Sequence, residues 1–278
     1  MPAHLYQEGD SFLHRLNPAV KLAAFSALIL VPTLFLDPAL PAAFLIISLL
    51  IGWGLGGVSP AAVLRRLVPL VVAAAGLAVF NTFFYGGPHT HLLLAWGWVR
   101  IWAEGLALGA SIGLRILCIA SWSALFVWTT DPAQLTASFI QQAHLPYRLA
   151  YAALAAYRFL PVLQDELANI RAAHAVRGAY AGRSLRAWLG RVRRYGVPLL
   201  ANGIRQAERL AIAMDARGFG ALPIRTSYVQ TSITAADCLF LVGTAVMIPL
   251  VLIGLARLGL LSGFLAGAAE SLAGGSPR

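Results

Sequence analysis

The chain has 278 residues, of which 59% are hydrophobic and only 12% are charged, and its formal net charge is +10. Too much of its surface would be apolar, and too little ionic, for a water-soluble globule. The positive charge could indicate nucleic acid, but beside a membrane, anionic lipid and acidic protein partners explain it more simply. The composition therefore predicts an all-α, polytopic membrane protein embedded in a lipid bilayer, with no nucleic-acid partner.

Five apolar windows are long enough to approach the roughly 20 helical residues needed to cross ~30 Å of hydrocarbon. They are Ala19–Leu36, Ala39–Val58, Leu67–Tyr85, Gly105–Trp128 and Ala235–Ala256. We therefore expect about five transmembrane helices. Both cysteines, Cys118 and Cys238, lie inside these windows, so no disulfide or zinc framework is indicated.

Arginine is concentrated in one part of the chain. Between Arg148 and Arg225 there are thirteen arginines against four acidic residues. The positive-inside rule places this stretch in the cytoplasm, and the cations at Arg15 and Lys21, just before the first window and at its start, place the N-terminus there too.

The fourth window carries a glycine at every fourth position, at Gly105, Gly109 and Gly113. Small residues at this spacing let two helix backbones approach closely in lipid. The partner on this face is either another span of the same chain or a separate membrane protein. Arg115 lies near the centre of the window, where an unpaired charge is costly, so it should face the interior of the bundle.

Helix signals change after the fourth window. Asp131 is a good N-cap and Pro132 suits the first helical position, which predicts an amphipathic helix. A long helical run ending at Arg177 should follow, bent at Pro161. We expect a break at Gly196 and Pro198, and then a second helix. This divides the chain into a four-span region at 1–130, a region of two long cytoplasmic helices at 131–225, and a last span with its tail at 226–278.

Both long helices are expected to end in a similar motif. The two motifs are Ala175-Val176-Arg177-Gly178 and Asp215-Ala216-Arg217-Gly218. Glycine can adopt the left-handed conformation that closes a helix, and the tip could then push its guanidinium into a groove on a partner. The alternative is two ordinary glycine caps, each with a cation favoured by the helix dipole. The candidate docking residues are Ala175, Arg177, Gly178, Ala216, Arg217 and Gly218.

Sequence signatures of catalysis are not found. Lys21, the sole lysine, is not preceded by the glycine-rich loop of a P-loop ATPase, and there is no metal-binding H-E-x-x-H or nucleophilic G-x-S-x-G motif. His89 and His91 lack a third ligand and are more typical of a solvated loop. We therefore predict no catalytic residue, no cofactor and no bound metal.

The order of these motifs resembles the transmembrane T-component of energy-coupling factor (ECF) transporters, the EcfT/CbiQ family. The resemblance rests on Ser11 to Pro18 with Lys21, on Thr129-Thr130-Asp131-Pro132, on Leu145-Pro146, on Arg158-Phe159-Leu160-Pro161 and on the two arginine motifs. It covers most of residues 10–220. Val176 stands where the family has alanine.

The resemblance implies a non-catalytic subunit of a prokaryotic importer in the cell membrane. Its partners would be two cytoplasmic ABC-type ATPases, gripped by the two arginine tips, and a membrane-embedded S-component that binds a vitamin or a transition-metal ion. ATP-driven motion would pass through the two coupling helices to the S-component. The alternatives are a self-contained secondary transporter or channel, which needs polar residues at mid-membrane and usually internal repeats, and a polytopic membrane enzyme.

Overall fold

The computed structural model describes residues 9–35, 37–84, 92–96, 99–177, 184–222 and 228–260. The chain divides into two compact units. Of the described residues, Thr136–Gln230 form one unit, here called the long-helix unit, and those up to Leu135 and from Thr231 onward form the other, the bundle unit. Each unit is described by itself.

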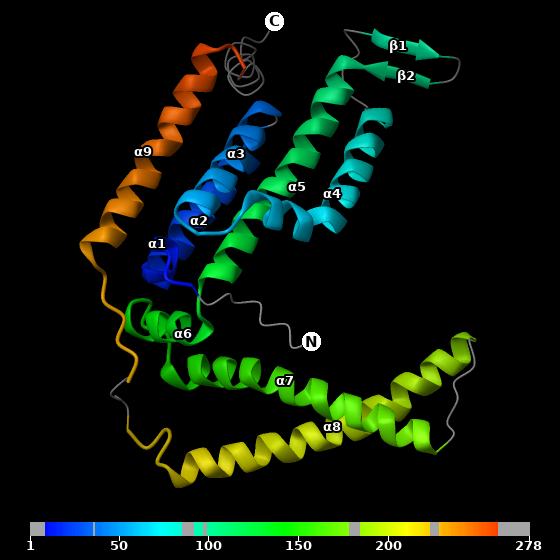
Figure 1. Ribbon diagram of the computed structural model, residues 1–278, viewed down its shortest axis with the longest axis vertical. Coiled ribbons are helices and arrows are strands. Elements are labelled where there is room, and N and C mark those ends of the chain that lie inside the picture. Colours follow the sequence, from blue (N-terminus) through cyan, green and yellow to red (C-terminus); the bar gives the residue numbers. More distant parts are fainter. Residues whose placement is uncertain are drawn as a thin grey trace, which may run out of the picture. The chain divides into compact units, whose positions relative to one another are not determined.

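The bundle unit consists of packed helices and one hairpin of strands (Figure 1). Its described elements are α1 (Phe12–Arg15), α2 (Pro18–Thr33), α3 (Ala39–Gly54), α4 (Pro60–Phe83), β1 (Leu92–Trp96), β2 (Val99–Trp102), α5 (Ala103–Thr129) and α9 (Ala235–Arg257), with the start of α6 (Pro132–Gln141). Each of the five apolar windows therefore coincides with a helix. Among the described residues, α5 and α9 are long and apolar enough to cross a membrane alone, and three shorter apolar helices accompany them. The prediction of a helical membrane protein is confirmed.

The antiparallel hairpin β1–β2 was not predicted. The stretch from Gly86 to Arg100, which holds His89 and His91, was interpreted from the sequence as an external loop, and the two strands correct that interpretation. Alternation is hard to recognise there because Leu92, Leu93 and Leu94 are consecutive apolar residues, and such runs do not distinguish a strand from a loop next to a span.

Aromatic residues fill the core of the bundle unit. The Phe25 ring of α2 meets the Trp122 ring of α5 edge-on at 4.9 Å between centroids, and Phe240 of α9 lies 6.3 Å from Phe25. Phe25 and Trp122 are fully buried. The hydroxyls of Ser48 in α3 and Ser121 in α5 are hydrogen-bonded at 2.7 Å. The core thus joins α2, α3, α5 and α9.

Arg115 faces other parts of the bundle unit, as predicted. Its Nη2 donates to the carbonyl of Phe35, just beyond α2, and to the hydroxyl of Ser111 in α5. The guanidinium therefore links α5 to the backbone just beyond α2 through a charged hydrogen bond.

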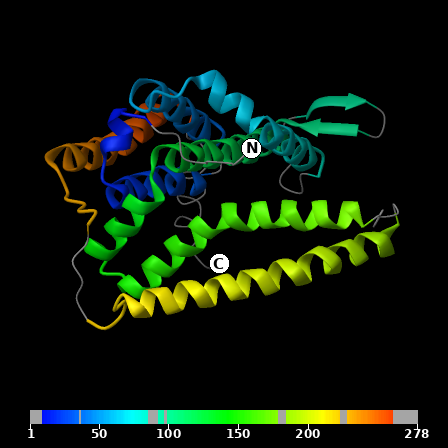
Figure 2. The same cartoon turned by 60° about the horizontal axis from the view of Figure 1, so that its bottom comes forward.

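The long-helix unit contains most of α6 and two much longer helices, α7 (Tyr147–Val176) and α8 (Leu185–Ala216). The amphipathic helix α6 starts as predicted, with the Asp131 carboxylate accepting the N–H of Ala133 at 3.1 Å. Helices α7 and α8 run in opposite directions along each other (Figures 1 and 2). They contact each other directly.

One boundary was predicted wrongly. The expected break at Gly196 and Pro198 does not occur, because α8 begins at Leu185 and continues through both residues. Ser184 caps this start, its hydroxyl accepting the N–H of Ala187 at 3.2 Å. A proline removes only one hydrogen bond from a helix, and the full set over 32 residues outweighs that local loss.

Candidate functional site

The two arginine motifs lie at the ends of the two long helices. Helix α7 ends at Val176, with Arg177 as its C-cap, and α8 ends at Ala216, with Arg217 as its C-cap. Because the helices run antiparallel, the two ends lie at opposite extremes of the pair (Figure 2). Each helix is roughly 45 Å long at 1.5 Å per residue, so the tips are well separated.

The end of α8 is a glycine cap with two hydrogen bonds. The N–H of Gly218 donates to the carbonyl of Asp215 at 2.9 Å, and that of Phe219 donates to Met214 at 3.0 Å. Gly218 has φ +71°, in the left-handed region. This is the Schellman arrangement, in which the residue after the C-cap must turn left-handed, and it explains why glycine follows Arg217.

The end of α7 is described only as far as Arg177. Its N–H donates to the carbonyl of Ala173 at 3.3 Å, and Val176 is 90% exposed. Gly178, the third candidate residue of this motif, lies outside the described residues, as do His89 and His91. Ala175, Arg177, Ala216 and Arg217 all lie on the two helix ends, where the motif placed them.

Both arginines are available to a partner. Arg177 and Arg217 are exposed, and neither guanidinium hydrogen-bonds another residue in the described part of the chain. An exposed, unpaired guanidinium presents five N–H donors to a carboxylate or a backbone carbonyl. Such a tip suits docking on a protein surface.

The tip of α8 is anchored to the start of α7 by residues that the sequence analysis did not assign to the site. The Phe219 ring packs edge-on against Tyr147 and Tyr151, with centroids 5.6 and 6.2 Å away. Arg148 donates to the carbonyl of Gly220 at 2.6 Å, and the Tyr147 hydroxyl to that of Leu222 at 2.8 Å. In the sequence, these contacts were signalled only by an aromatic residue directly after the second arginine motif, Phe219, and another directly after Leu145-Pro146, Tyr147.

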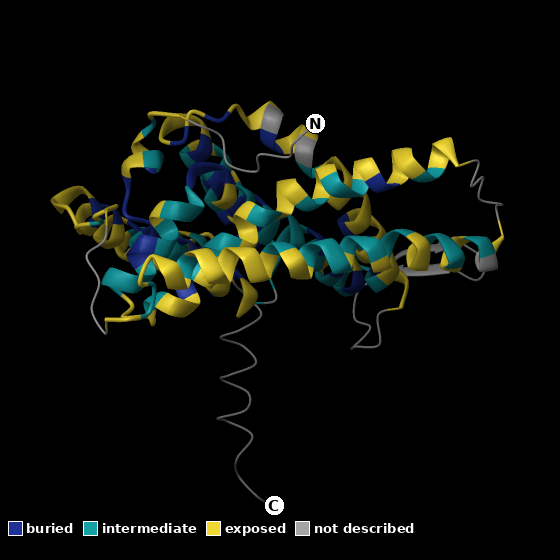
Figure 3. Cartoon of the chain, turned by 90° about the horizontal axis from the view of Figure 1, so that it is seen from below, coloured by how far each residue is buried: buried dark blue, intermediate teal, exposed yellow. Residues whose placement is uncertain are grey.

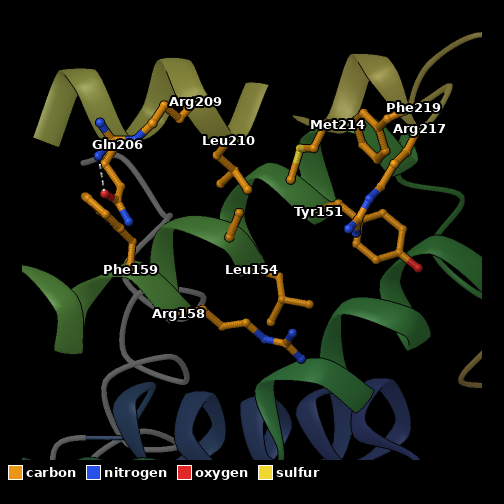
Figure 4. Close-up of a pocket in the computed structure, with 11 residues that line it drawn as sticks. Tyr151, Leu154, Arg158, Phe159, Gln206, Arg209, Leu210, Met214, Arg217 and Phe219 are labelled. Atoms are coloured by element: carbon orange, nitrogen blue, oxygen red, sulfur yellow. Dashed lines mark hydrogen bonds between the residues drawn. The ribbon is translucent and has the colours of Figure 1, made fainter. Parts of the chain in front are cut away.

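A groove of about 720 Å³ runs between α7 and α8 at this end (Figure 4). Its cationic lining residues are Arg158, Arg209 and Arg217, and its walls include Phe159, Met214 and Leu210. Figure 4 shows Arg217 and Phe219 pointing from the end of α8 toward Tyr151 of α7. The groove therefore joins the second arginine motif to the Arg158 motif that precedes Pro161.

Where the long helices cross, few side chains hold them together. Gly203 of α8 faces Leu163 and Phe159 of α7, and Asn202 donates to the carboxylate of Glu166. In the described part of α8, no side chain is buried. Figure 3 shows that most residues of α7 and α8 are exposed or half-buried. Such open helices leave room for partners on their surfaces.

The glycine face of α5 is filled within the bundle unit. A side-chain carbon on Gly109 would lie 2.4 Å from the Ala78 carbonyl and 2.4 Å from the Thr82 hydroxyl of α4, and one on Gly113 would lie 3.2 Å from Ala74. Gly105 is buried as well. In this structure a separate membrane protein could reach the face only if α4 moved away.

Over the described residues, no cluster of three or more histidine, cysteine, aspartate or glutamate side chains could hold a metal ion. Cys118 is buried and Cys238 is exposed, and both are free thiols.

Apolar spans, an aromatic core and a separate pair of long helices define a helical membrane protein with an attached long-helix unit. Comparison with known sequences identifies the family. The pattern of the cobalt transport protein family, CbiQ, matches residues 9–228. The chain belongs to the family of transmembrane T-components of ECF transporters, and it is a transporter membrane subunit.

Several curated relatives carry the name energy-coupling factor transporter transmembrane protein EcfT. The protein of Thermosediminibacter oceani is 32% identical over 262 residues, which cover 87% of this chain and 93% of the relative. That of Listeria innocua is 30% identical over 262 residues, with the same coverage of both chains. That of Clostridium kluyveri is 29% identical over 242 residues, covering 84% of this chain and 88% of the relative.

Proposed function

We propose that the chain is the coupling subunit of an ECF-type importer, which transmits ATP-driven motion from two cytoplasmic ATPases to a substrate-binding S-component. The ATPases would hydrolyse ATP, and this chain would catalyse no reaction. The single observation that carries the proposal is the placement of Arg177 and Arg217. They lie exposed at opposite ends of two long antiparallel helices, an arrangement suited to gripping two separate proteins.

The distance between the two tips supports two partners rather than one. A rigid helix of roughly 45 Å moves its whole length when one end is displaced, because its backbone hydrogen bonds resist bending. Two ATPases that close on ATP would displace both ends together. Motion of this kind would reach the S-component through α7 and α8 in the proposed assembly.

The proposed location is a prokaryotic cell membrane, crossed several times. The windows now seen as α2, α3, α4, α5 and α9 would be the spans. The thirteen arginines between Arg148 and Arg225 support a cytoplasmic long-helix unit, and Arg15 supports a cytoplasmic N-terminus. The cargo would be a vitamin or a transition-metal ion, chosen by the S-component.

Co-purification tests the proposal most directly. The full chain, tagged at its C-terminus and expressed in its own host, should retain two nucleotide-binding subunits and one small membrane protein in mild detergent, identified by mass spectrometry. The complex, reconstituted in liposomes, should then take up one of Co²⁺, Ni²⁺ or a set of radiolabelled vitamins only when ATP is supplied on the side of the ATPases.

Two outcomes would contradict the proposal. One is a chain that purifies without nucleotide-binding subunits from cells in which transport is active. The other is a chain that moves one of these substrates across a liposome membrane by itself, with an ion gradient and no ATP, which would make it a secondary transporter or channel.

A further inference from the structure

Two ionisable residues are buried at the same end of the bundle unit, although they lie near opposite ends of the sequence. Lys21 in α2 and Asp237 in α9 are each only 1% exposed. A charge buried in a membrane protein is costly unless it is paired and hydrogen-bonded, so these residues require an explanation.

The Lys21 ammonium binds the last residues of α5 and the residue after it. Its Nζ donates to the Thr129 carbonyl at 3.0 Å, and it lies 3.4 Å from the Thr129 hydroxyl and 3.3 Å from the Thr130 hydroxyl. An ammonium has three donors, and here all of them have acceptors. Lys21 thereby ties α2 to the C-terminal end of α5.

The Asp237 carboxylate binds the other side of the same cluster. One oxygen accepts the N–H of Asn17 at 2.7 Å, and the other accepts the N–H and the hydroxyl of Thr234, each at 2.7 Å. The Asn17 side chain also donates to the carbonyl of Ser232 at 3.3 Å. Asp237 thereby ties the start of α9 to the residue that caps α2.

These contacts coincide with the two points where the chain leaves and rejoins the bundle unit. The chain leaves soon after Thr130, since the long-helix unit begins at Thr136, and it returns at Thr231. Both points are therefore held against α2, within a few residues of the connections. Inside the long-helix unit, Gln141 likewise donates to the carbonyl of Val229 at 2.8 Å, so its own two ends are tied as well.

We propose that Lys21 and Asp237 form a clamp that fixes both attachment points of the long-helix unit to α2, so that force on the long helices moves the bundle instead of stretching the connections. The inference rests on the proposed function. A connection held at one point can yield by local opening, whereas two connections joined through a fully satisfied polar cluster open only together. Lys21 and Asp237 are positioning residues for energy coupling.

A purely structural role makes a different prediction. If the cluster only stabilised the fold, its loss would lower complex yield, ATP hydrolysis and uptake in parallel. A clamp for force transmission predicts that hydrolysis continues while uptake for each ATP falls. The buried hydroxyl pair Ser48–Ser121 is the matched control, because it also joins two helices of the bundle unit through a hydrogen bond but lies away from the attachment points.

The first experiment measures the clamp in the full chain without its partners. Val127 of α5 and Val242 of α9 are exposed and can carry spin labels as cysteines, in a background with Cys118→Ala and Cys238→Ser. The distance distribution between the labels should be narrow, should become roughly twofold broader in Lys21→Met through local opening, and should stay narrow in Ser48→Ala. An unchanged width in Lys21→Met overturns the clamp.

The second experiment measures coupling in the complex, reconstituted with the ATPases and the small membrane protein that co-purify. For Lys21→Met we expect uptake per ATP to fall roughly tenfold while ATP hydrolysis stays within about twofold, a loss typical of the coupling energy between two sites. The probe is whichever of Co²⁺, Ni²⁺ or the labelled vitamins the unaltered complex takes up. Ser48→Ala should keep the ratio unchanged.

Two further variants guard against misfolding. Thr130→Val removes one acceptor from Lys21 and should reduce uptake per ATP by a smaller factor than Lys21→Met does. Lys21→Arg keeps the positive charge, so its uptake per ATP should be higher than that of Lys21→Met. A parallel loss of hydrolysis and uptake in all variants overturns the clamp. If the unaltered chain retains no ATPases, the proposed function fails, whereas the spin-label distances still decide whether the clamp exists.

Discussion

The bundle unit and the long-helix unit are both helical, but they achieve their stability differently. In the bundle unit, aromatic side chains such as Phe25 and Trp122 are fully buried, and buried polar groups are joined in networks. In the long-helix unit, the described residues of α7 with buried side chains are Ala150 and Ile170 alone. A unit with so little core of its own can open locally at a small cost in free energy.

This difference agrees with a division of labour. The bundle unit packs its own helices together, including the glycine face of α5, which is occupied by α4. The long-helix unit instead leaves two arginines and a groove open. Substitutions in the two units should therefore fail in different ways, and four predictions follow this contrast from the largest effect to the smallest.

The largest effect is expected from reversing the charge at both helix ends. Arg177→Glu with Arg217→Glu should leave the chain in the membrane but abolish ATP-dependent uptake, because breaking a desolvated charged contact at an interface costs about 2–5 kcal/mol for each tip. The amounts of co-purified ATPase and the uptake rate measure this. Arg193→Glu with Arg194→Glu, at exposed arginines inside α8, is the control and should retain both. Normal transport by the first variant would exclude docking through these tips.

A bundle substitution should act on stability instead. In Gly109→Ala the new methyl group would meet the Ala78 carbonyl of α4, so α4 and α5 must separate, at a cost of about 1–3 kcal/mol. Thermal unfolding in detergent measures the loss. Gly76→Ala in α4, where a methyl group would meet nothing within 4 Å, is the control and should unfold at the original temperature. Equal unfolding temperatures for both variants would contradict the close contact.

A smaller effect is expected at the cap of α8. Gly218→Ala places a side chain on a residue with φ +71°, which costs about 1–2 kcal/mol and should loosen the tip that carries Arg217. Retention of ATPase should fall while the unfolding temperature of the bundle unit stays the same. Gly190→Ala, in the interior of α8, has open space around it and should bind as before. Undiminished retention in Gly218→Ala would show that the cap does not hold the tip.

The smallest effect is expected at the other end of α8. Ser184→Ala removes the hydroxyl that accepts the N–H of Ala187, at a cost of about 0.5–1 kcal/mol. Because the effect is local, faster amide hydrogen exchange should be confined to the first turn of α8. Uptake should be almost unchanged. Faster exchange throughout α8 would contradict a local effect and would mean that the loss of the cap destabilises the whole helix.

Much of the fold could be read directly from the order of residues. Helical spans require continuous apolar runs, and each of the five runs became a helix. The start of α6 at Asp131-Pro132 and the left-handed turn at Gly218 depend on the properties of single residues, so they too were predictable. Helix boundaries near proline were less so, since α8 continues through Pro198 where a break was expected.

The supports of the α8 tip could not be predicted, because they join residues far apart in the chain. Tyr147 and Arg148 meet Phe219 and Gly220 only after α7 and α8 have folded back along each other. Neither pair shows a periodicity that identifies its partner. Residues of this kind are visible in the sequence only as aromatic and basic side chains near a helix end.

The sequence by itself determined the membrane class, the apolar helices and the two arginine-tipped helix ends, because each depends on composition or on neighbours within one or two helical turns. The tertiary structure decided which helix fills the glycine face of α5, and that Lys21 and Asp237, 216 positions apart, belong to one polar cluster. The physical reason is that a buried charge is tolerated only where partners converge on it, and packing alone determines which partners those are.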